Sequence, residues 1–347
     1  GRPNAPTLLM VGSSFDHNGY DGLQIKNYVS QFSYLQQFAY AFGSSFDHNG
    51  NDGVQLSNVL DYGIVNTAAL STVTPYQLGI VYSDVSHNGA DGLDIENTTI
   101  AESALIQGVY LSDSHFDDNH DYGIISNSTN GNGSLLLQRT VLYSYLTGMS
   151  ADGNGADGVQ VAITGGSQAI YAASAVYVYS ANGAPAGDFS NNGASGISIL
   201  AANGAHNNSY IYNANVDHNA IAGISLSSFD YAEQFAYIGL NTISNNPVGV
   251  LAYESNALQI VSVYNNYYTH APMGNVFSGN STDVAASGAG GEIGRGGDGG
   301  NMGGPEAADG DALLRRAQNA VAPTHKLRRN PFRPAIDHDL NSDSRCT

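Results

Sequence analysis

Residues 14–25 read SFDHNGYDGLQI, and residues 45–56 repeat this segment almost letter for letter as SFDHNGNDGVQL. Each copy consists of an apolar residue, two polar residues, an Asn, a short Gly-containing turn and two aliphatic residues two positions apart. Looser copies begin near Val85, Phe116, Asn154, Phe189, Val216, Ile243 and Phe277. A unit repeated at this period, with the pattern strand, tight turn, strand, predicts a solenoid.

The aliphatic pairs indicate what the solenoid is made of. Leu23/Ile25, Val54/Leu56 and Leu93/Ile95 have the period-two spacing of a strand with one buried face, and no segment of the repeats has helical period. A Gly precedes each pair, where we expect a sharp turn that needs its φ freedom. Successive turn glycines lie 31, 39, 31, 35, 38, 27 and 26 residues apart, which suits one coil of three short strands with loops of varying length.

The Asn of each repeat predicts an internal ladder. Equivalent positions of successive parallel coils stack at about 4.8 Å, so a side-chain amide can bond to the coils on both sides. The alternative is an Asn chosen only for its turn conformation. The ladder residues are Asn18, Asn49, Asn88, Asn119, Asn192, Asn219 and Asn246.

An Asn followed by Asp-Gly-Leu-x-Ile, as in Asn88 with residues 91–95, resembles the repeat of the pectate-lyase-like and mannuronan C5-epimerase-like proteins. The resemblance covers about residues 8–285 and implies an all-β fold, a single right-handed parallel β-helix of about eight or nine coils. Such repeats serve lyases, epimerases, tailspikes and plain surface stalks, so the resemblance implies a fold and leaves the activity open.

The chain divides into three parts by composition. We expect the β-helix at residues 1–285, a Gly-rich linker at residues 286–310 and a tail at residues 311–347. A short helix at residues 311–322 that caps the solenoid and a plain linker are equally compatible with the tail. The single cysteine, Cys346, excludes a disulfide framework, and no apolar run reaches membrane-spanning length, so we expect no membrane insertion.

The net charge of the chain is −19, and residues 3–290 contain two basic residues, Lys26 and Arg139, against 22 Asp and Glu. Nucleic acid binding is excluded on this ground, because neutralising phosphates requires several Lys or Arg. Enzymes that act on uronates must also neutralise a carboxylate. Lys26 and Arg139 lie about three coils apart, so we expect them not to share a site.

The densest group of candidate catalytic residues lies at residues 117–122, where three carboxylates crowd one turn. Asp118, His120, Asp121 and Tyr122, with Arg139 as the cation, are of the types that an epimerase or lyase uses as acid, base and neutraliser. The epimerases it resembles have an Asp-Pro-His signature after a Tyr-Gly step, and Tyr122-Gly123 is followed by Ile-Ile-Ser-Asn instead. We therefore favour an exposed acidic turn.

Metal binding is a further hypothesis. The Asp-His-Asn turns predict columns of carboxylates and imidazoles on successive coils, and Asp16, Asp47, Asp21 and Asp52 are the candidate Ca²⁺ ligands. A ladder of histidines that holds a transition metal is a second alternative, and a polar turn that faces solvent is the favoured one. No cofactor is required by the sequence.

The tyrosines suggest a possible glycan contact. Tyr40, Tyr110, Tyr210 and Tyr237 each lie nine residues before a ladder Asn, so they should form one column. Facing outward they would form a platform for sugar rings, and facing inward they would belong to the core, which is the interpretation we favour.

Two function classes remain. The first is a noncatalytic scaffold, an adhesin-like module at a bacterial cell surface or outside the cell, whose partners are an extracellular glycan, another surface protein or, end to end, a second copy. The alternative is a polysaccharide lyase or C5-epimerase with a divergent site. The regular repeats and the few basic residues favour the scaffold.

Overall fold

The computed structural model describes residues 7–30, 34–35, 37–66, 77–166, 171–181, 184–264, 274–287 and 292–296. Within these ranges the regular structure consists of strands, and no helix suited to crossing a membrane occurs. The predicted helix at residues 311–322 and Cys346 lie outside the described residues.

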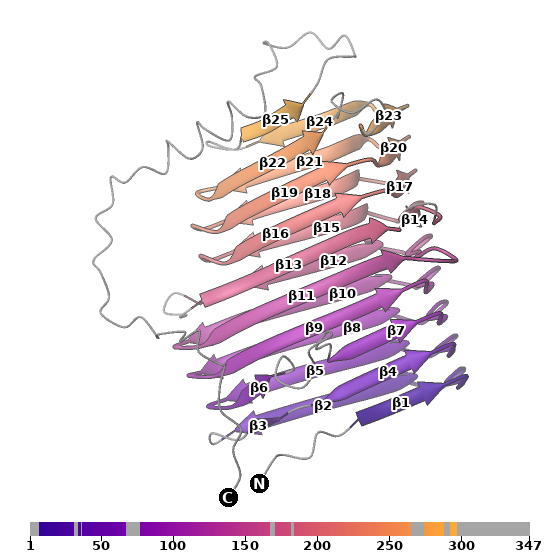
Figure 1. The fold of residues 1–347 in the computed structure, drawn as a ribbon, viewed down its shortest axis with the longest axis vertical. Helices are drawn as coiled ribbons and strands as arrows, with labels where there is room; N and C mark the ends of the chain where they lie inside the picture. Colours follow the sequence, from indigo (N-terminus) through magenta and orange to yellow (C-terminus); the bar gives the residue numbers. More distant parts are fainter. Residues whose placement is uncertain are drawn as a thin grey trace, which may run out of the picture.

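The strands form three stacked sheets in which all pairing is parallel (Figure 1). The nine-stranded sheet consists of β2 (Leu23–Ser30), β5 (Val54–Asp61), β8 (Leu93–Ala101), β10 (Ile124–Asn132), β12 (Val159–Thr164), β15 (Ser195–Ala202), β18 (Ala222–Phe229), β21 (Val248–Ser255) and β24 (Thr282–Ser287). The four-stranded sheet consists of β14 (Gly187–Asp188), β17 (Ala214–Asp217), β20 (Thr242–Ser244) and β23 (Val276–Ser278).

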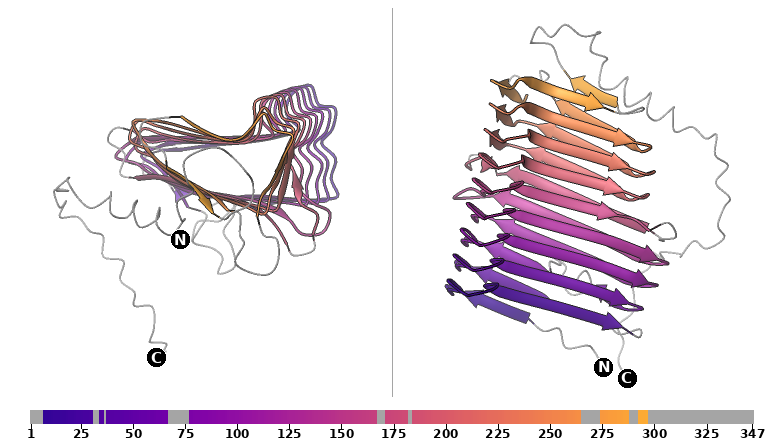
Figure 2. Two further views of the ribbon diagram at one scale, coloured as in Figure 1. Left: turned by 90° about the horizontal axis from the view of Figure 1, so that it is seen from above. Right: turned by 180° about the vertical axis from the view of Figure 1, so that it is seen from behind.

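The third sheet has twelve strands. Its strands are β1 (Thr7–Val11), β3 (Tyr34–Leu35), β4 (Phe38–Phe42), β6 (Ile64–Asn66), β7 (Leu78–Val81), β9 (Ala104–Ser112), β11 (Leu135–Ser144), β13 (Tyr171–Ser180), β16 (His206–Tyr212), β19 (Glu233–Gly239), β22 (Leu258–Tyr264) and β25 (Glu292–Gly296). Each coil contributes to both large sheets, and seen along the stack the coils superimpose (Figure 2). The predicted parallel β-helix is confirmed by this pairing.

The β-helix continues past the boundary predicted at residue 285. Strand β24 ends at Ser287, and β25 pairs with β22 from Ile260↔Glu292 to Tyr264↔Gly296. The first part of the segment expected to be a Gly-rich linker therefore includes a strand of the twelve-stranded sheet.

The core is a stack of aliphatic and Phe side chains with a polar row beside it. Phe46, Phe116 and Phe189 are fully buried in the larger apolar cluster, and a smaller cluster contains Leu60 and Leu105. A row of buried amides bonds from coil to coil. Its members are Asn58, Gln77, Asn97, Gln107 and Gln138, which bond to one another directly or through Ser128. The repeat pattern did not predict this row.

The predicted Asn ladder is confirmed. Asn88 accepts bonds from the backbone N–H and side-chain amide of Asn49 at 3.0 and 3.1 Å, and donates both of its own to Asn119 Oδ1 at 3.0 Å. The same pattern runs from Asn18 to Asn280 and includes Asn154, which the prediction omitted. Asn18 is exposed at the end of the ladder, whereas Asn49, Asn88, Asn119, Asn154, Asn192, Asn219 and Asn246 are buried.

The turn glycines serve a different purpose from the predicted one. The described residues with positive φ include His17, His48 and His87 but not Gly22, Gly53 or Gly92. A Cβ on Gly92 would lie 2.5 Å from the carbonyl oxygen of Gly123 in the next coil. Gly is required there because neighbouring coils approach too closely for a side chain.

Candidate functional site

A surface hollow of about 460 Å³ lies beside the start of β2 and β5. It is lined by Tyr20, Asp21, Gln24, Lys26, Asn51 and Gln55. Tyr20 is 82% exposed, so both faces of its ring are open to a ligand. The hollow therefore combines an open aromatic ring with amide, carboxylate and ammonium groups, the types of group that bind a polar organic molecule.

The polar groups of this hollow hold one another in place. Asp21 accepts bonds from the amides of Asn51, at 2.7 Å, and Gln24, at 2.6 Å. Gln24 also donates to Gln55 Oε1 at 2.8 Å. An Asp-Gly turn comes directly before β2 and before β5, and Gln24 and Gln55 are register partners in these adjacent coils. The turns and the strand register together bring these side chains side by side. The result is a preorganised set of donors and acceptors on a rigid sheet.

Three more carboxylates lie near the starts of β5 and β8, where Asp52 and Asp94 are buried and Asp91 is half-buried. Burial, together with the charge of neighbouring carboxylates, raises the pKa of Asp52 to about 6, of Asp91 to about 7 and of Asp94 to about 6. Gln55 links two of them, donating to Asp94 at 3.1 Å and lying 3.5 Å from Asp52. The row is acidic and takes up protons near neutral pH.

The structure brings His120, Asp121 and Tyr122 together, whereas Asp118 and Arg139 pair with other residues. His120 Nδ1 lies 3.0 Å from Asp121 Oδ1, and the backbone N–H of Tyr122 donates to Asp91 Oδ1 at 3.0 Å. Asp118 lies instead 3.6 Å from His87 Nε2. Arg139 belongs to β11 in the twelve-stranded sheet, with its guanidinium carbon 5.0 Å from the ring centre of Tyr177. Catalysis at this group stays a prediction, because Arg139, its cation, lies on the twelve-stranded sheet, whereas Tyr122 lies in the turn before β10 of the nine-stranded sheet.

The tyrosine column lies on the outer face of the twelve-stranded sheet, so the favoured core interpretation is wrong. Tyr40, Tyr110, Tyr210 and Tyr237 share one register row, which Gly79 and Val141 interrupt and to which Tyr177 also belongs. Tyr210 stacks between Tyr177 and Tyr237 with centroid separations of 5.1 Å. Neighbouring rings cover its two faces, so a sugar ring has no open face to stack on there. Glycan binding by this column stays a prediction.

The predicted calcium ligands fall into two pairs on neighbouring coils. Asp16 Oδ1 accepts bonds from Ser45 Oγ at 2.6 Å and from the Asp47 N–H at 2.8 Å. Asp21 Oδ1 likewise accepts from the Asp52 N–H at 3.3 Å. These carboxylate oxygens thus have donors in the protein, and Ca²⁺ binding stays a prediction.

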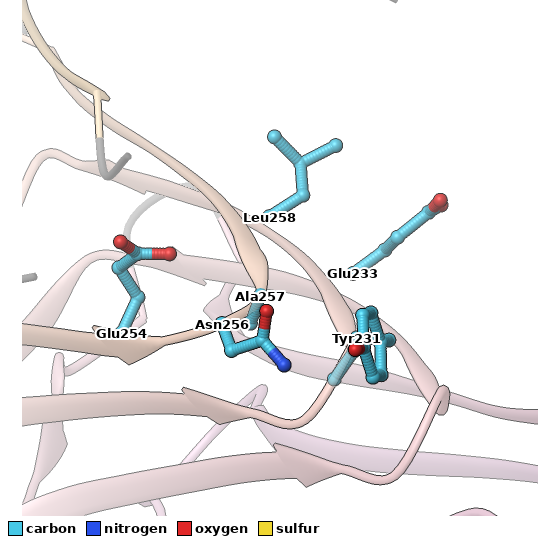
Figure 3. A pocket seen from close by; sticks show the side chains of 7 residues that line it. Tyr231, Glu233, Glu254, Asn256, Ala257 and Leu258 are labelled. Carbon is cyan, nitrogen blue, oxygen red and sulfur yellow. The ribbon is translucent and has the colours of Figure 1, made fainter. Parts of the chain in front are cut away.

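A second hollow, of about 450 Å³, lies where strands β18 and β21 turn into β19 and β22. Tyr231, which is 77% exposed, lies beside Glu233 and Asn256 in this hollow (Figure 3). It repeats the combination of an exposed tyrosine ring with a carboxylate and an amide.

A signal for the first hollow is present in the two nearly identical repeats, although the repeat pattern alone did not predict a site there. Residues 14–25 and 45–56 differ at three positions, and two of these exchange one aliphatic residue for another. The third places Tyr20 opposite Asn51, and both line the hollow. A nonconservative difference between two such repeats marks a position that stacking does not determine.

Comparison with known proteins yields two solved structures and no sequence family. No family model and no curated protein matches the chain. The A-module of mannuronan C-5 epimerase AlgE4 from Azotobacter vinelandii is similar at 13% identity, with a TM-score of 0.33, over 83% of this chain and 91% of that chain. The A-module of AlgE6 from the same organism has 13% identity and a TM-score of 0.30, over 86% and 92%.

Proposed function

We propose that the protein is an extracellular, noncatalytic β-helix scaffold, adhesin-like in use, that contacts neutral glycans through the hollow beside Tyr20. The open ring of Tyr20 carries this proposal, because an exposed aromatic face packs against the C–H face of a pyranose. Asp21, Gln24 and Asn51 lie in the same hollow and offer acceptors and donors to sugar hydroxyls. Their mutual hydrogen bonds reduce the entropy lost when a ligand orders them.

The charge of the surface supports a neutral rather than an anionic glycan. Among the residues that line the hollow, Lys26 is the one cation, and Asp21 lies in the same hollow. A polyuronate would be repelled, because residues 3–290 contain 22 acidic residues against two basic ones.

A second candidate function, polysaccharide lyase or C5-epimerase, is favoured by one observation. Asp91 has a pKa of about 7, suited to a general base or acid near neutral pH, and Tyr122 is bonded to it through its backbone. Against it, Arg139 lies on the twelve-stranded sheet, and Lys26 is on β2, two strands away from β8, which Asp91 precedes.

A glycan panel tests both candidates. We expect the full chain to bind a neutral polysaccharide, Tyr20→Ala to weaken this binding about tenfold, and Tyr28→Ala to bind within about twofold of the wild type. Tyr28 is the matched control because it is an exposed tyrosine on β2 that does not line the hollow. Binding unaffected by Tyr20→Ala would overturn the proposal.

The same panel should be monitored for unsaturated-uronate absorbance and for epimerised product. We expect neither. Cleavage or epimerisation that Asp91→Asn abolishes, with an unfolding midpoint no lower than that of the wild type, would establish the enzyme instead.

A further inference from the structure

Three histidines stack on one corner of the β-helix. His17, His48 and His87 occupy the same position in three successive turns, each with a positive φ of 59°, 57° and 56°. Their rings are almost parallel, with centroid separations of 5.0 Å for the first pair and 4.8 Å for the second. The stacking follows from the repeat, because equivalent residues of successive parallel coils lie one strand spacing apart.

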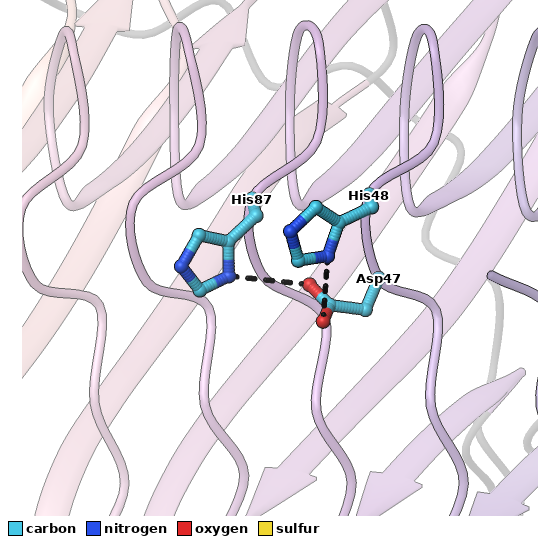
Figure 4. Close-up of side chains that lie close together, drawn as sticks. All are labelled: Asp47, His48 and His87. Carbon is cyan, nitrogen blue, oxygen red and sulfur yellow. Dashed lines mark hydrogen bonds and ion pairs between the residues drawn. The ribbon is translucent and has the colours of Figure 1, made fainter. Parts of the chain in front are cut away.

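A carboxylate beside the stack bridges the Nδ1 atoms of two of these rings. Asp47 Oδ2 is 2.9 Å from His48 Nδ1, and Asp47 Oδ1 is 3.3 Å from His87 Nδ1 (Figure 4). One ligand atom from each of the three side chains lies within 4.8 Å of the other two. On the opposite edge of the ring, His87 Nε2 lies 3.6 Å from Asp118 Oδ2, and a proton held there by this carboxylate leaves the Nδ1 lone pair free for a metal.

We propose that Asp47, His48 and His87 form a binding site for a borderline divalent metal ion of the Zn²⁺ and Ni²⁺ class. Two imidazole nitrogens and one carboxylate oxygen are a donor set that such ions accept, at bond lengths of about 2.0–2.2 Å. A water molecule completes the coordination. Calcium does not suit this site, because it selects oxygen ligands almost exclusively.

The site can contract onto a metal without disturbing the fold. The side chains of His48 and His87 are about half exposed, at 50% and 49%. Their rings can therefore turn about the Cβ–Cγ bond without loss of core packing. The backbones that carry them are fixed by the Asn ladder, since Asn49 and Asn88, the next residues, bond to each other.

Other histidines of the described chain lack this arrangement. His218 occupies the same turn position with φ 53°, and its Nδ1 lies 2.7 Å from Asp217 Oδ2. Its column neighbours are Asn191 and Asn245, so it has a carboxylate but no second imidazole. His218 is thus a matched control within the same protein.

Asn is the substitution of choice, because Asn191 and Asn245 already adopt this backbone conformation in the same column, with φ of 55° and 54°. The variants are His48→Asn, His87→Asn and His218→Asn, each in the full chain without an affinity tag. Zn²⁺ binding is titrated calorimetrically at neutral pH in a non-chelating buffer, with and without excess Ca²⁺. Unfolding midpoints without metal verify that the variants fold.

We expect His48→Asn and His87→Asn each to weaken the tightest Zn²⁺ binding event at least about tenfold, and His218→Asn to leave it within about twofold of the wild type. Zn²⁺ should raise the thermal midpoint of the wild type and of His218→Asn but not of His48→Asn. Equal losses in all three variants, displacement of Zn²⁺ by Ca²⁺, or no saturable binding by the wild type would each overturn the proposal.

Discussion

At the scale of single residues, the ladder asparagines stabilise the fold by satisfying polar groups between coils. Asn88 is buried, and its side chain serves as both donor and acceptor. Its oxygen accepts two bonds from the previous coil, so removing the side chain leaves buried donors without partners.

Asn88→Ala should therefore lower the free energy of unfolding by about 1–3 kcal/mol. The measurement is the urea unfolding midpoint and slope of the variant and the wild type. Asn127→Ala is the control, because Asn127 is an exposed residue of β10, and a change within about 0.5 kcal/mol is expected. Equal midpoints for Asn88→Ala and the wild type would contradict a stabilising ladder.

At the scale of elements, parallel stacking places like side chains from successive strands side by side. This arrangement is favourable for amides, which both donate and accept. For carboxylates it is unfavourable, and burial next to neighbouring carboxylates raises the pKa values of Asp52, Asp91 and Asp94. Between the unfolded pKa near 3.8 and the folded pKa near 7, the folded state binds more protons at Asp91 than the unfolded state.

The protein should consequently lose stability as the pH rises from about 4 to about 7, through the ionisation of these carboxylates. Asp91→Asn keeps an oxygen that can accept the Tyr122 N–H, and it should raise the free energy of unfolding at about pH 8 by about 2 kcal/mol while changing it little near pH 4. Urea unfolding across this pH range is the measurement. A variant whose pH dependence matches that of the wild type would contradict the assignment.

Close contact between coils is a second element-scale constraint. A Cβ at position 92 would meet the backbone of the next coil at 2.5 Å, where no flexible side chain can yield. Gly92→Ala should destabilise by more than about 2 kcal/mol. Gly19→Ala is its control, since a Cβ there would have no atom within 4 Å. Gly→Ala alone lowers the entropy of the unfolded chain and should not destabilise, so similar losses in both variants would contradict close packing as the reason for Gly92.

At the scale of the whole molecule, the excess of negative charge determines which polymers the β-helix can bind. Residues 3–290 contain 22 acidic and two basic residues, which repels polyanions along the whole length of the stack. A chain truncated after Gly296 should pass through a heparin column without retention at physiological salt, because it has too few Lys and Arg to release counterions. Retention that falls with added salt would contradict this prediction.

The two ends of the stack are the natural places for self-association. Strand β1 is an edge of the twelve-stranded sheet, and its Leu9 and Val11 are exposed. An unpaired edge strand can template pairing with another chain, so end-to-end association through β1 stays a prediction. Sedimentation over a range of concentrations, with Leu9→Lys as the comparison, would test it.

The sequence by itself determined the coil. The period of the repeat, the apolar pairs and the Asn predicted the stacked parallel strands and the ladder, because in a solenoid each repeat meets mainly its own equivalents in adjacent coils. That logic also predicts columns, including the histidines and the tyrosines. It could not determine which way a column faces, since an aromatic residue suits either face, and it missed the amide row inside the core because Asn and Gln are read as surface residues.

Only the tertiary structure decided which stacked side chains come into contact with one another. His120 and Arg139 lie 19 residues apart in the sequence, yet they lie on different parts of the coil, whereas Asp47 and His87, 40 residues apart, are in contact. Loop lengths set how far each coil runs before it turns, and the register of neighbouring strands sets which side chains then lie side by side. Both depend on the packing of whole coils, so the Tyr20 hollow and the paired imidazoles emerge only when the coils are stacked.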